Sequence, residues 1–193
     1  MILHTTYFGS VDWYRLLLST DETVYIEACE NYVKQTSRNR CEIATANGKQ
    51  ILTVPVTTPS RPPKWGGEKY KVTEVLVSDH GNWRHQHWET LKSSYGMSPF
   101  FEYYEDDIRP FFERRWETLF DYNLAIIRKV NALIGIDKEI RLTNTYQGPA
   151  AEPTGYPARE YYQTFRRKHG FIGGLSILDL LFNEGPQSIL YLS

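Results

Sequence analysis

The stretch NYVKQTSRNRCEIATANGKQILTVPV, residues 31–56, carries the signal that decides the fold. Its Asn47-Gly48 step predicts a two-residue type I′ turn, because both central residues of that turn need positive φ, which Asn and Gly adopt most cheaply. The turn predicts an antiparallel hairpin, which Pro55 ends because it has no amide hydrogen to donate. The expected register pairs Ala46 with Lys49, Ile43 with Leu52, Cys41 with Val54, and Arg40 with Pro55.

Two arginines stand where this hairpin opens. If the chain is extended through Asn39, Arg38 and Arg40 emerge on the same side, about 7 Å apart. Two guanidinium groups at that distance could clamp a phosphate or a carboxylate through bidentate, charge-assisted hydrogen bonds. The alternative is a surface ion pair with Glu42 or Glu30, which contributes little to stability. Because exposed ion pairs are so common, the spacing alone favours the ion pair.

Length and composition restrict the class of protein. A chain of 193 residues suffices for one domain with a substantial core, and no stretch approaches the roughly 20 apolar residues of a membrane span. The opening residues MILHTTYFGSVDWY lack the basic and apolar regions of a signal peptide, so we expect a cytoplasmic protein. A net charge of −1 gives no bulk attraction for nucleic acid. Cys29 and Cys41 are too few for a disulfide scaffold or a zinc site.

The N-terminal pattern predicts a parallel βαβ unit. Residues 1–8 read as a strand, Ser10 as the N-cap of a helix over 11–19, and residues 22–28 as a second strand. In such a unit the turn after the first strand, residues 8–13, lies at the ligand-binding edge of the sheet. This turn contains Gly9 alone, so the Gly-rich loops that bind dinucleotides or nucleoside triphosphates are absent.

The remaining pattern completes an α/β fold: a single domain over 1–193 with a mixed sheet, the βαβ unit and the hairpin, covered by long amphipathic helices. Irregular loops are expected near 57–67 and 145–159, where Pro and Gly gather. The other expected elements are strands over 71–78 and 140–145, and helices over 83–95, from 98 to a break at Pro110, and over 111–134, 161–169 and 177–182. Ser176 is the expected N-cap of the last of these helices.

His87 is the candidate catalytic residue. An imidazole titrates near neutral pH and can act as an acid or a base. Its helix places it on one face with Leu91 and Tyr95, so a core histidine bonded to a neighbour is the alternative. His85 points to the opposite side, where we expect solvent. No His-x-x-x-His, Cys-x-x-Cys or Gly-x-Ser-x-Gly spacing occurs, so neither a metal site nor a hydrolase triad has support.

Two carboxylates lie in the C-terminal segment. Asp179 and Glu184 flank the apolar residues 180–182. They could pair with Arg38 or Arg40, or they could bind sugar hydroxyls beside the arginines. The sequence leaves both alternatives open.

Several motifs together resemble the WbqC-like family, with matching pieces near both ends and in the middle. The motifs are the segment 31–56, Trp83…His87…Tyr95…Pro99-Phe100-Phe101, and Tyr162-Gln163…Phe165…Leu175 followed by residues 176–186, SILDLLFNEGP. The C-terminal block is the most specific. The turn after the first strand keeps the family's aromatics, Tyr7 and Trp13 among them, but lacks the expected Gln-Pro opening. The Gly- and Tyr-rich stretch of longer members is reduced here to Thr145–Arg159.

The resemblance implies a role beside genes for O-antigen and other surface polysaccharides, in making or decorating a nucleotide-linked sugar, and it does not settle the reaction. Because two arginines lie on one strand face beside an aromatic-rich turn, our leading hypothesis is group transfer on a nucleotide-linked sugar, without a cofactor, with seven residues in contact with the substrate and His87 as proton acceptor. We expect Arg38, Asn39 and Arg40 at the diphosphate, Tyr7 or Trp13 stacked on the base or sugar, and Asp179 or Glu184 at the rim of the same pocket. The alternative is a non-catalytic partner of a polysaccharide enzyme that docks through Trp65 and Tyr70.

Overall fold

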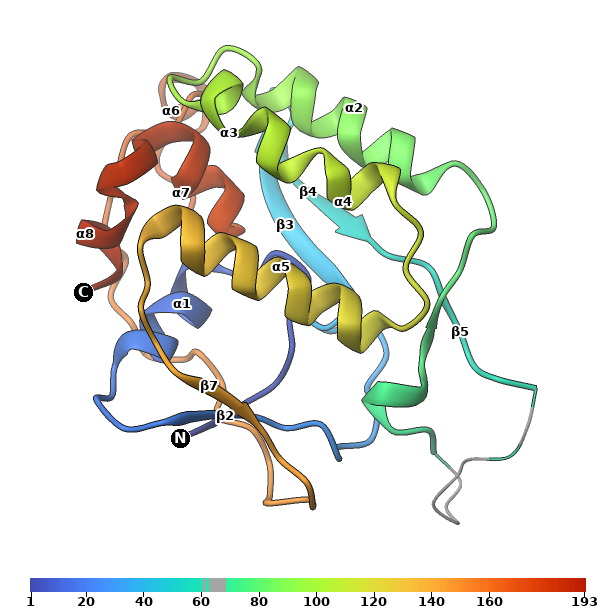
Figure 1. Ribbon diagram of the computed structural model, residues 1–193. Coiled ribbons are helices and arrows are strands. Elements are labelled where there is room, and N and C mark those ends of the chain that lie inside the picture. Colours follow the sequence, from blue (N-terminus) through green and yellow to red (C-terminus); the bar gives the residue numbers. More distant parts are fainter. Residues whose placement is uncertain (61, 63–68) are drawn as a thin grey trace.

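The N-terminal βαβ unit is present in the computed structural model, which describes residues 1–60, 62 and 69–193. Strand β1 (Ile2–Leu3) pairs in parallel with β2 (Val24–Ile26), and helix α1 (Val11–Leu18) connects them. Strand β7 (Ile140–Leu142) adds to β2, also in parallel, so the strand order is β1-β2-β7 (Figure 1). Ser10 caps α1 as predicted, its hydroxyl accepting from the Trp13 amide.

The predicted hairpin is formed by β3 (Arg40–Thr45) and β4 (Gly48–Thr53), but the expected register is wrong by two residues. Thr45 pairs with Gly48, so the connection consists of Ala46 and Asn47. Gly48 has φ +101, whereas Phe8 and Gln35 are the non-glycine residues with positive φ in the described chain. Asn47 therefore does not adopt the backbone of a type I′ turn.

The two-residue shift leaves the faces of the hairpin unchanged, because side chains alternate with a period of two. The predicted apolar face is buried, and its members are Cys41, Ile43, Leu52 and Val54. Pro55 lies outside the ladder, as predicted. It separates β4 from β5 (Val56–Thr57), which pairs in antiparallel fashion with β6 (Leu76–Val77).

The α/β class, the βαβ unit and the hairpin are thus confirmed. Among the described residues, the parallel and antiparallel strands form three small sheets. The strand predicted over 71–78 is shorter than expected, because Val72–Glu74 form a 3-10 helix before β6. Residues 143–165 contain no helix or strand, which confirms the irregular segment near 145–159. The loop predicted near 57–67 falls partly on residues 61 and 63–67, which lie outside the described residues.

Helices α2 (Trp83–Tyr95), α3 (Phe101–Ile108), α4 (Pro110–Glu113) and α5 (Leu119–Ile134) form the middle of the chain. The helix predicted over 111–134 is wrong in one respect, because residues 114–118 interrupt it. Thr118 starts α5 anew by accepting a hydrogen bond from the Asp121 amide. Gly135 ends α5 with φ +80, as its C-cap position predicts.

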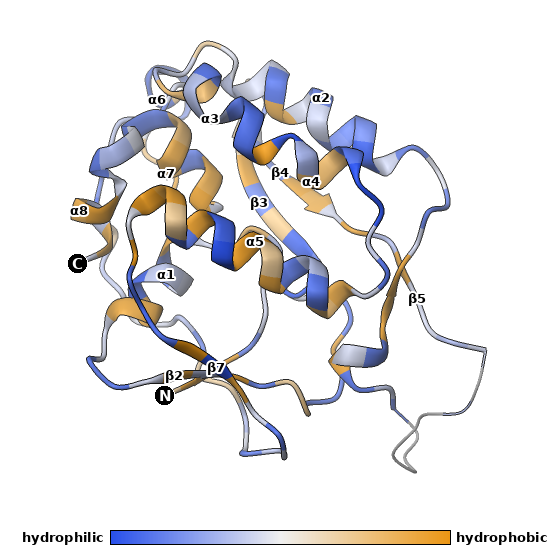
Figure 2. Cartoon of the chain, viewed as in Figure 1, coloured by the Kyte–Doolittle hydropathy of each residue, from blue (hydrophilic) through white to orange (hydrophobic). Residues whose placement is uncertain are grey.

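The C-terminal part consists of α6 (Arg166–His169), α7 (Ile177–Glu184), a 3-10 helix (Gly185–Gln187) and α8 (Ser188–Leu192). One connected hydrophobic core runs from Leu3 to Leu192 and includes the buried faces of α1, α2, α5 and α7. Figure 2 shows apolar residues along both α5 and α7. Within the described ranges, no helix is long and apolar enough to cross a membrane.

Candidate functional site

Three segments that are far apart in the sequence meet beside the open end of the hairpin. Ser10, at the start of α1, and Ser176, at the start of α7, form an antiparallel bridge. Two backbone hydrogen bonds flank the bridge, from Val11 N to Leu175 O at 2.9 Å and from Ile177 N to Gly9 O at 2.8 Å. The Ser176 amide also donates to the carbonyl of Glu42 in β3 at 2.7 Å. These bonds hold the N-termini of both helices against the hairpin.

A cavity of about 400 Å³ opens at this junction, and we call it the Arg40 cavity. Its volume lies in the range of about 300–1,000 Å³ that is usual for small-molecule sites. It is lined by Ser10, Gln35, Thr36, Ser37, Arg40, Cys41, Glu42, Lys49, Ile51, Gly174 and Ser176.

The charged residues of the Arg40 cavity favour an anion. Lys49 pairs with Glu42 at 2.6 Å, which leaves the charge of Arg40 uncompensated among the lining residues. The Arg40 Nε is buried and has no hydrogen-bond partner in the described part of the chain. The N-termini of α1 and α7 add positive partial charge at the same place. A phosphate or a carboxylate in this cavity would satisfy these groups.

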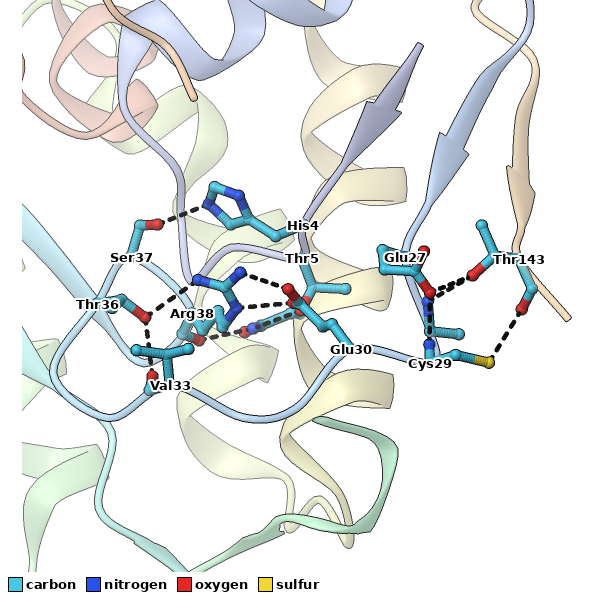
Figure 3. Close-up of polar contacts among 12 residues, drawn as sticks. His4, Thr5, Glu27, Cys29, Glu30, Val33, Thr36, Ser37, Arg38 and Thr143 are labelled. Carbon is cyan, nitrogen blue, oxygen red and sulfur yellow. Dashed lines mark hydrogen bonds and ion pairs between the residues drawn. The ribbon is translucent and has the colours of Figure 1, made fainter. Parts of the chain in front are cut away.

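Arg38, unlike Arg40, is not free to bind an anion. It is buried, and its guanidinium donates to Glu30 from Nε at 2.7 Å and from Nη2 at 2.5 Å (Figure 3). The ion-pair alternative therefore applies to Arg38, but the pair is buried rather than exposed. The predicted clamp of two arginines is wrong, because Glu30 already occupies one guanidinium. Asn39 is also buried, and its side-chain amide donates to the carbonyl of Val54.

Figure 3 shows how the turn after β1 lies against the segment before Arg38. The His4 ring is 2.7 Å from the Ser37 hydroxyl, and the Tyr7 amide donates to the Ser37 carbonyl at 2.9 Å. His4 and Tyr7 thus both contact Ser37, the residue directly before Arg38. Burial, with a smaller contribution from the charge of Arg38, lowers the pKa of His4 to about 3. His4 is therefore neutral beside that guanidinium at physiological pH.

His87 and Tyr7 form a buried pair, with 2.9 Å between the Tyr7 hydroxyl and His87 Nδ1. Burial lowers the pKa of His87 to about 4, and a hydrogen bond with the Thr53 backbone opposes that shift. His87 is therefore neutral near pH 7. Neither residue lines the Arg40 cavity, and Trp13 is buried in the core. His85 on the same helix is exposed, as predicted.

The C-terminal carboxylates do not meet the arginines, which corrects one alternative from the sequence. Asp179 is buried and accepts hydrogen bonds from the hydroxyls of Tyr95 and Tyr161, each at 2.8 Å, and from Gln163 at 3.0 Å. Burial raises the pKa of Asp179, and these three hydrogen bonds oppose the rise. Glu184 accepts from the Tyr162 amide at 2.8 Å. Neither carboxylate lines the Arg40 cavity.

Arg40 is thus the one predicted site residue in this cavity. The expected pocket that combines Tyr7 or Trp13, Arg38 or Arg40, His87 and a C-terminal carboxylate is not formed there. Sequence reasoning missed Ser37, Lys49 and Gly174. It identified Ser10 and Ser176 as helix caps, but no local signal shows that the two caps meet.

Across the described chain, no three His, Cys, Asp or Glu side chains gather in a group that could hold a metal ion.

Comparisons with known proteins place the chain in a family. The family model described as "WbqC-like protein family" matches residues 5–155. "Uncharacterized protein Rv1507c" of Mycobacterium tuberculosis strain H37Rv is 26% identical over 229 residues, covering 99% of this chain and 96% of that protein. No solved structure matches the chain. Because the family match spans well over half of the sequence, this chain belongs to the WbqC-like protein family.

Proposed function

We propose that this protein binds a nucleotide-linked sugar in the Arg40 cavity and acts in group transfer during surface polysaccharide synthesis. The observation that carries the proposal is the uncompensated guanidinium of Arg40, whose Nε has no partner among the described residues. Phosphate oxygens match the planar donor geometry of a guanidinium. Family membership supports the polysaccharide context, and the cytoplasmic location expected from the sequence belongs to the same proposal.

The Arg40 cavity can also bind the polar parts of such a ligand. The Ser10 hydroxyl accepts from the Trp13 amide and keeps its hydrogen for a ligand, whereas the hydroxyls of Ser37 and Ser176 are bonded to the His4 ring and the Phe8 carbonyl. Lys49 supplies a second cation whose partner, Glu42, is on the same wall. Cys41 is not a candidate nucleophile, because burial raises the pKa of its thiol far above the neutral range. The proposal therefore assigns the cavity to binding.

Binding is tested by isothermal titration calorimetry with UDP-N-acetylglucosamine, GDP-mannose and dTDP-glucose. Wild-type protein should bind at least one of these ligands, and Arg40→Ala should weaken that affinity about tenfold or more, because hydrogen bonds to charged groups are worth about 1.5–3 kcal/mol. Arg109→Ala is the matched control, since Arg109 pairs with Glu113 on an exposed helix face away from the cavity. Equal affinity of wild type and Arg40→Ala would overturn the proposal.

The predicted role of His87 needs a separate test, because this residue does not line the Arg40 cavity. If His87 accepts a proton during transfer, His87→Gln should abolish turnover and leave the affinity measured by calorimetry unchanged.

The alternative function is that of a non-catalytic partner protein that docks through Trp65 and Tyr70. Trp65 lies outside the described residues, and Tyr70 is half-buried with its hydroxyl bonded to the Pro59 carbonyl. If calorimetry detects no binding of any of the three nucleotide-linked sugars, that alternative is favoured.

A further inference from the structure

A second cavity, of about 230 Å³, adjoins the Arg40 cavity. Gly174 lines both, and the consecutive residues Ser10 and Val11 at the start of α1 line one each. We call it the Asp12 cavity, because α1 contributes Asp12 and Arg15 to its wall. The irregular segment 143–165 and the loop before α7 supply the rest of the wall, including Tyr156, Tyr161 and Phe171.

The chemistry of the Asp12 cavity differs from that of its neighbour. Phe171 packs edge-to-face on Tyr161, with ring centroids 5.3 Å apart. Arg15 lies over the Tyr156 ring at 4.8 Å and is 3.5 Å from the Asp12 carboxylate. Arg159 also lines this cavity, so the wall combines aromatic rings with one carboxylate acceptor and two guanidinium donors. A sugar ring has apolar C–H faces and hydroxyls at its edge, so it can use both kinds of group.

We propose that the Asp12 cavity holds the sugar ring of the ligand whose diphosphate lies at Arg40. This inference rests on the proposed function, and it assigns the two chemical parts of the ligand to two adjoining cavities. The phosphates are assigned to Arg40, whose Nε has no partner among the described residues, and the sugar ring to the cavity whose wall carries aromatic rings. A cavity of about 230 Å³ is below the usual lower limit of about 300 Å³ for an independent ligand site, which suits a single ring.

Gly174 provides the decisive variant, because it lies where the two cavities join. It has φ +73, and a Cβ built on it meets no atom within 4 Å, so a larger side chain here projects into open space. Gly170 has φ +71, equally open surroundings, and lines neither cavity. Gly174→Leu and Gly170→Leu both place a side chain at positive φ, but only the first obstructs the junction. Asp12→Asn is a third variant, which removes the charge and keeps the size.

Calorimetry compares each nucleotide-linked sugar, UDP-N-acetylglucosamine, GDP-mannose and dTDP-glucose, with the corresponding nucleoside diphosphate. Gly174→Leu and Asp12→Asn should weaken binding of the sugar-linked ligand about tenfold, or about 1.4 kcal/mol. Both variants should keep the affinity for the diphosphate within about twofold, and Gly170→Leu should change neither affinity.

Wild-type affinity for the sugar-linked ligand in Gly174→Leu and Asp12→Asn would overturn this inference. The proposed function would still stand in that case if Arg40→Ala weakens both ligands. If wild-type protein binds none of the nucleotide-linked sugars and none of the nucleoside diphosphates, both proposals are overturned.

Discussion

The carboxylate of Glu30 accepts two hydrogen bonds from the guanidinium of Arg38, and both side chains are buried. Asn123 on α5 donates to the backbone carbonyl of Arg38 at 2.7 Å, so the start of β3 is fixed to the core from two sides. Arg40, two residues later, reaches the cavity wall. Arg38 thus positions the strand, whereas Arg40 is available for a ligand.

Removal of Arg38 should therefore destabilise the fold. In Arg38→Ala the Glu30 carboxylate stays buried without its partner, which typically costs about 3–5 kcal/mol. Urea denaturation monitored by tryptophan fluorescence measures the loss of unfolding free energy. Arg109→Ala, which breaks an exposed pair on one helix, should cost less than about 1 kcal/mol.

A double variant separates the charge from the packing. Glu30→Met combined with Arg38→Met removes both charges, and stability should recover to above that of Arg38→Ala, because no unpaired charge is left in the interior. A loss below about 1 kcal/mol in Arg38→Ala would instead mean that the pair does not stabilise the fold.

The hairpin shows what the sequence predicts well and what it does not. Alternation of apolar residues correctly predicts that Cys41 and Ile43 are buried, and Pro55 correctly marks the end of the ladder. The register is not recoverable in the same way, because Asn47-Gly48 fits more than one turn type, and the backbone uses positive φ at Gly48 alone. Local signals fix which face is buried, while strand packing selects the turn.

The candidate site was harder to predict, because its parts come from distant segments. The caps Ser10 and Ser176 follow from local rules, yet their bridge depends on how α1 and α7 pack. Asp179 looked like a partner for an arginine, but two tyrosine hydroxyls and an amide satisfy it. Neutral donors of this kind leave no charge pattern in a sequence, so the pairing could not be inferred.

The buried histidines predict how stability depends on pH. The folded pKa of His87 is about 4 and that of His4 about 3, below the ordinary value of 6.5. Between these folded values and pH 6.5 the unfolded chain binds more protons, so stability is full above pH 6.5 and is lost as the pH falls toward 4. Each histidine contributes a slope of up to about 1.4 kcal/mol per pH unit.

Denaturant titrations between pH 5 and pH 6.5, within about one unit of the ordinary histidine pKa, measure this slope. His87→Gln should reduce the slope by the contribution of one proton relative to wild type. His85→Gln, an exposed position on the same helix, should leave the slope unchanged. An identical slope in wild type and His87→Gln would contradict the burial of a neutral imidazole at this position.

Two tyrosines that bind Asp179 should differ in their contribution to stability. Tyr161 and Tyr95 each donate to the carboxylate at 2.8 Å, but the Tyr95 hydroxyl also accepts from the Ala44 amide of β3 at 3.1 Å. Tyr161→Phe removes one hydrogen bond to a charged group, worth about 1.5–3 kcal/mol. Tyr95→Phe leaves the buried Ala44 amide unsatisfied as well, so it should cost about 1 kcal/mol more. Equal losses in thermal unfolding would argue against this network.

Gly185 explains why two of the family-like motifs occur together. The Phe100 amide donates to the carbonyl of Phe182 at 3.0 Å, which brings the residues after α7 against the Phe100 ring. A Cβ at Gly185 would lie 2.5 Å from that ring, closer than real Cβ contacts, and Gly185 has φ +56. Gly135 also has positive φ, +80, but its surroundings are open. Gly135 has the left-handed helical backbone with ψ 28, whereas Gly185 has ψ −128, so Gly185 combines a backbone that other residues avoid with a steric conflict.

Gly135→Ala should cost about 1–2 kcal/mol, the price of a left-handed backbone alone. Gly185→Ala should cost about 1–3 kcal/mol more, because the ring of Phe100 must move out of a packed position and because φ 56, ψ −128 is a backbone region that alanine avoids. Urea unfolding of both variants measures the difference, and Phe100→Leu in the Gly185→Ala background should restore part of the loss by clearing space. If the two alanine variants are equally stable, Phe100 gives way freely, and the contact between the motifs does not constrain the fold.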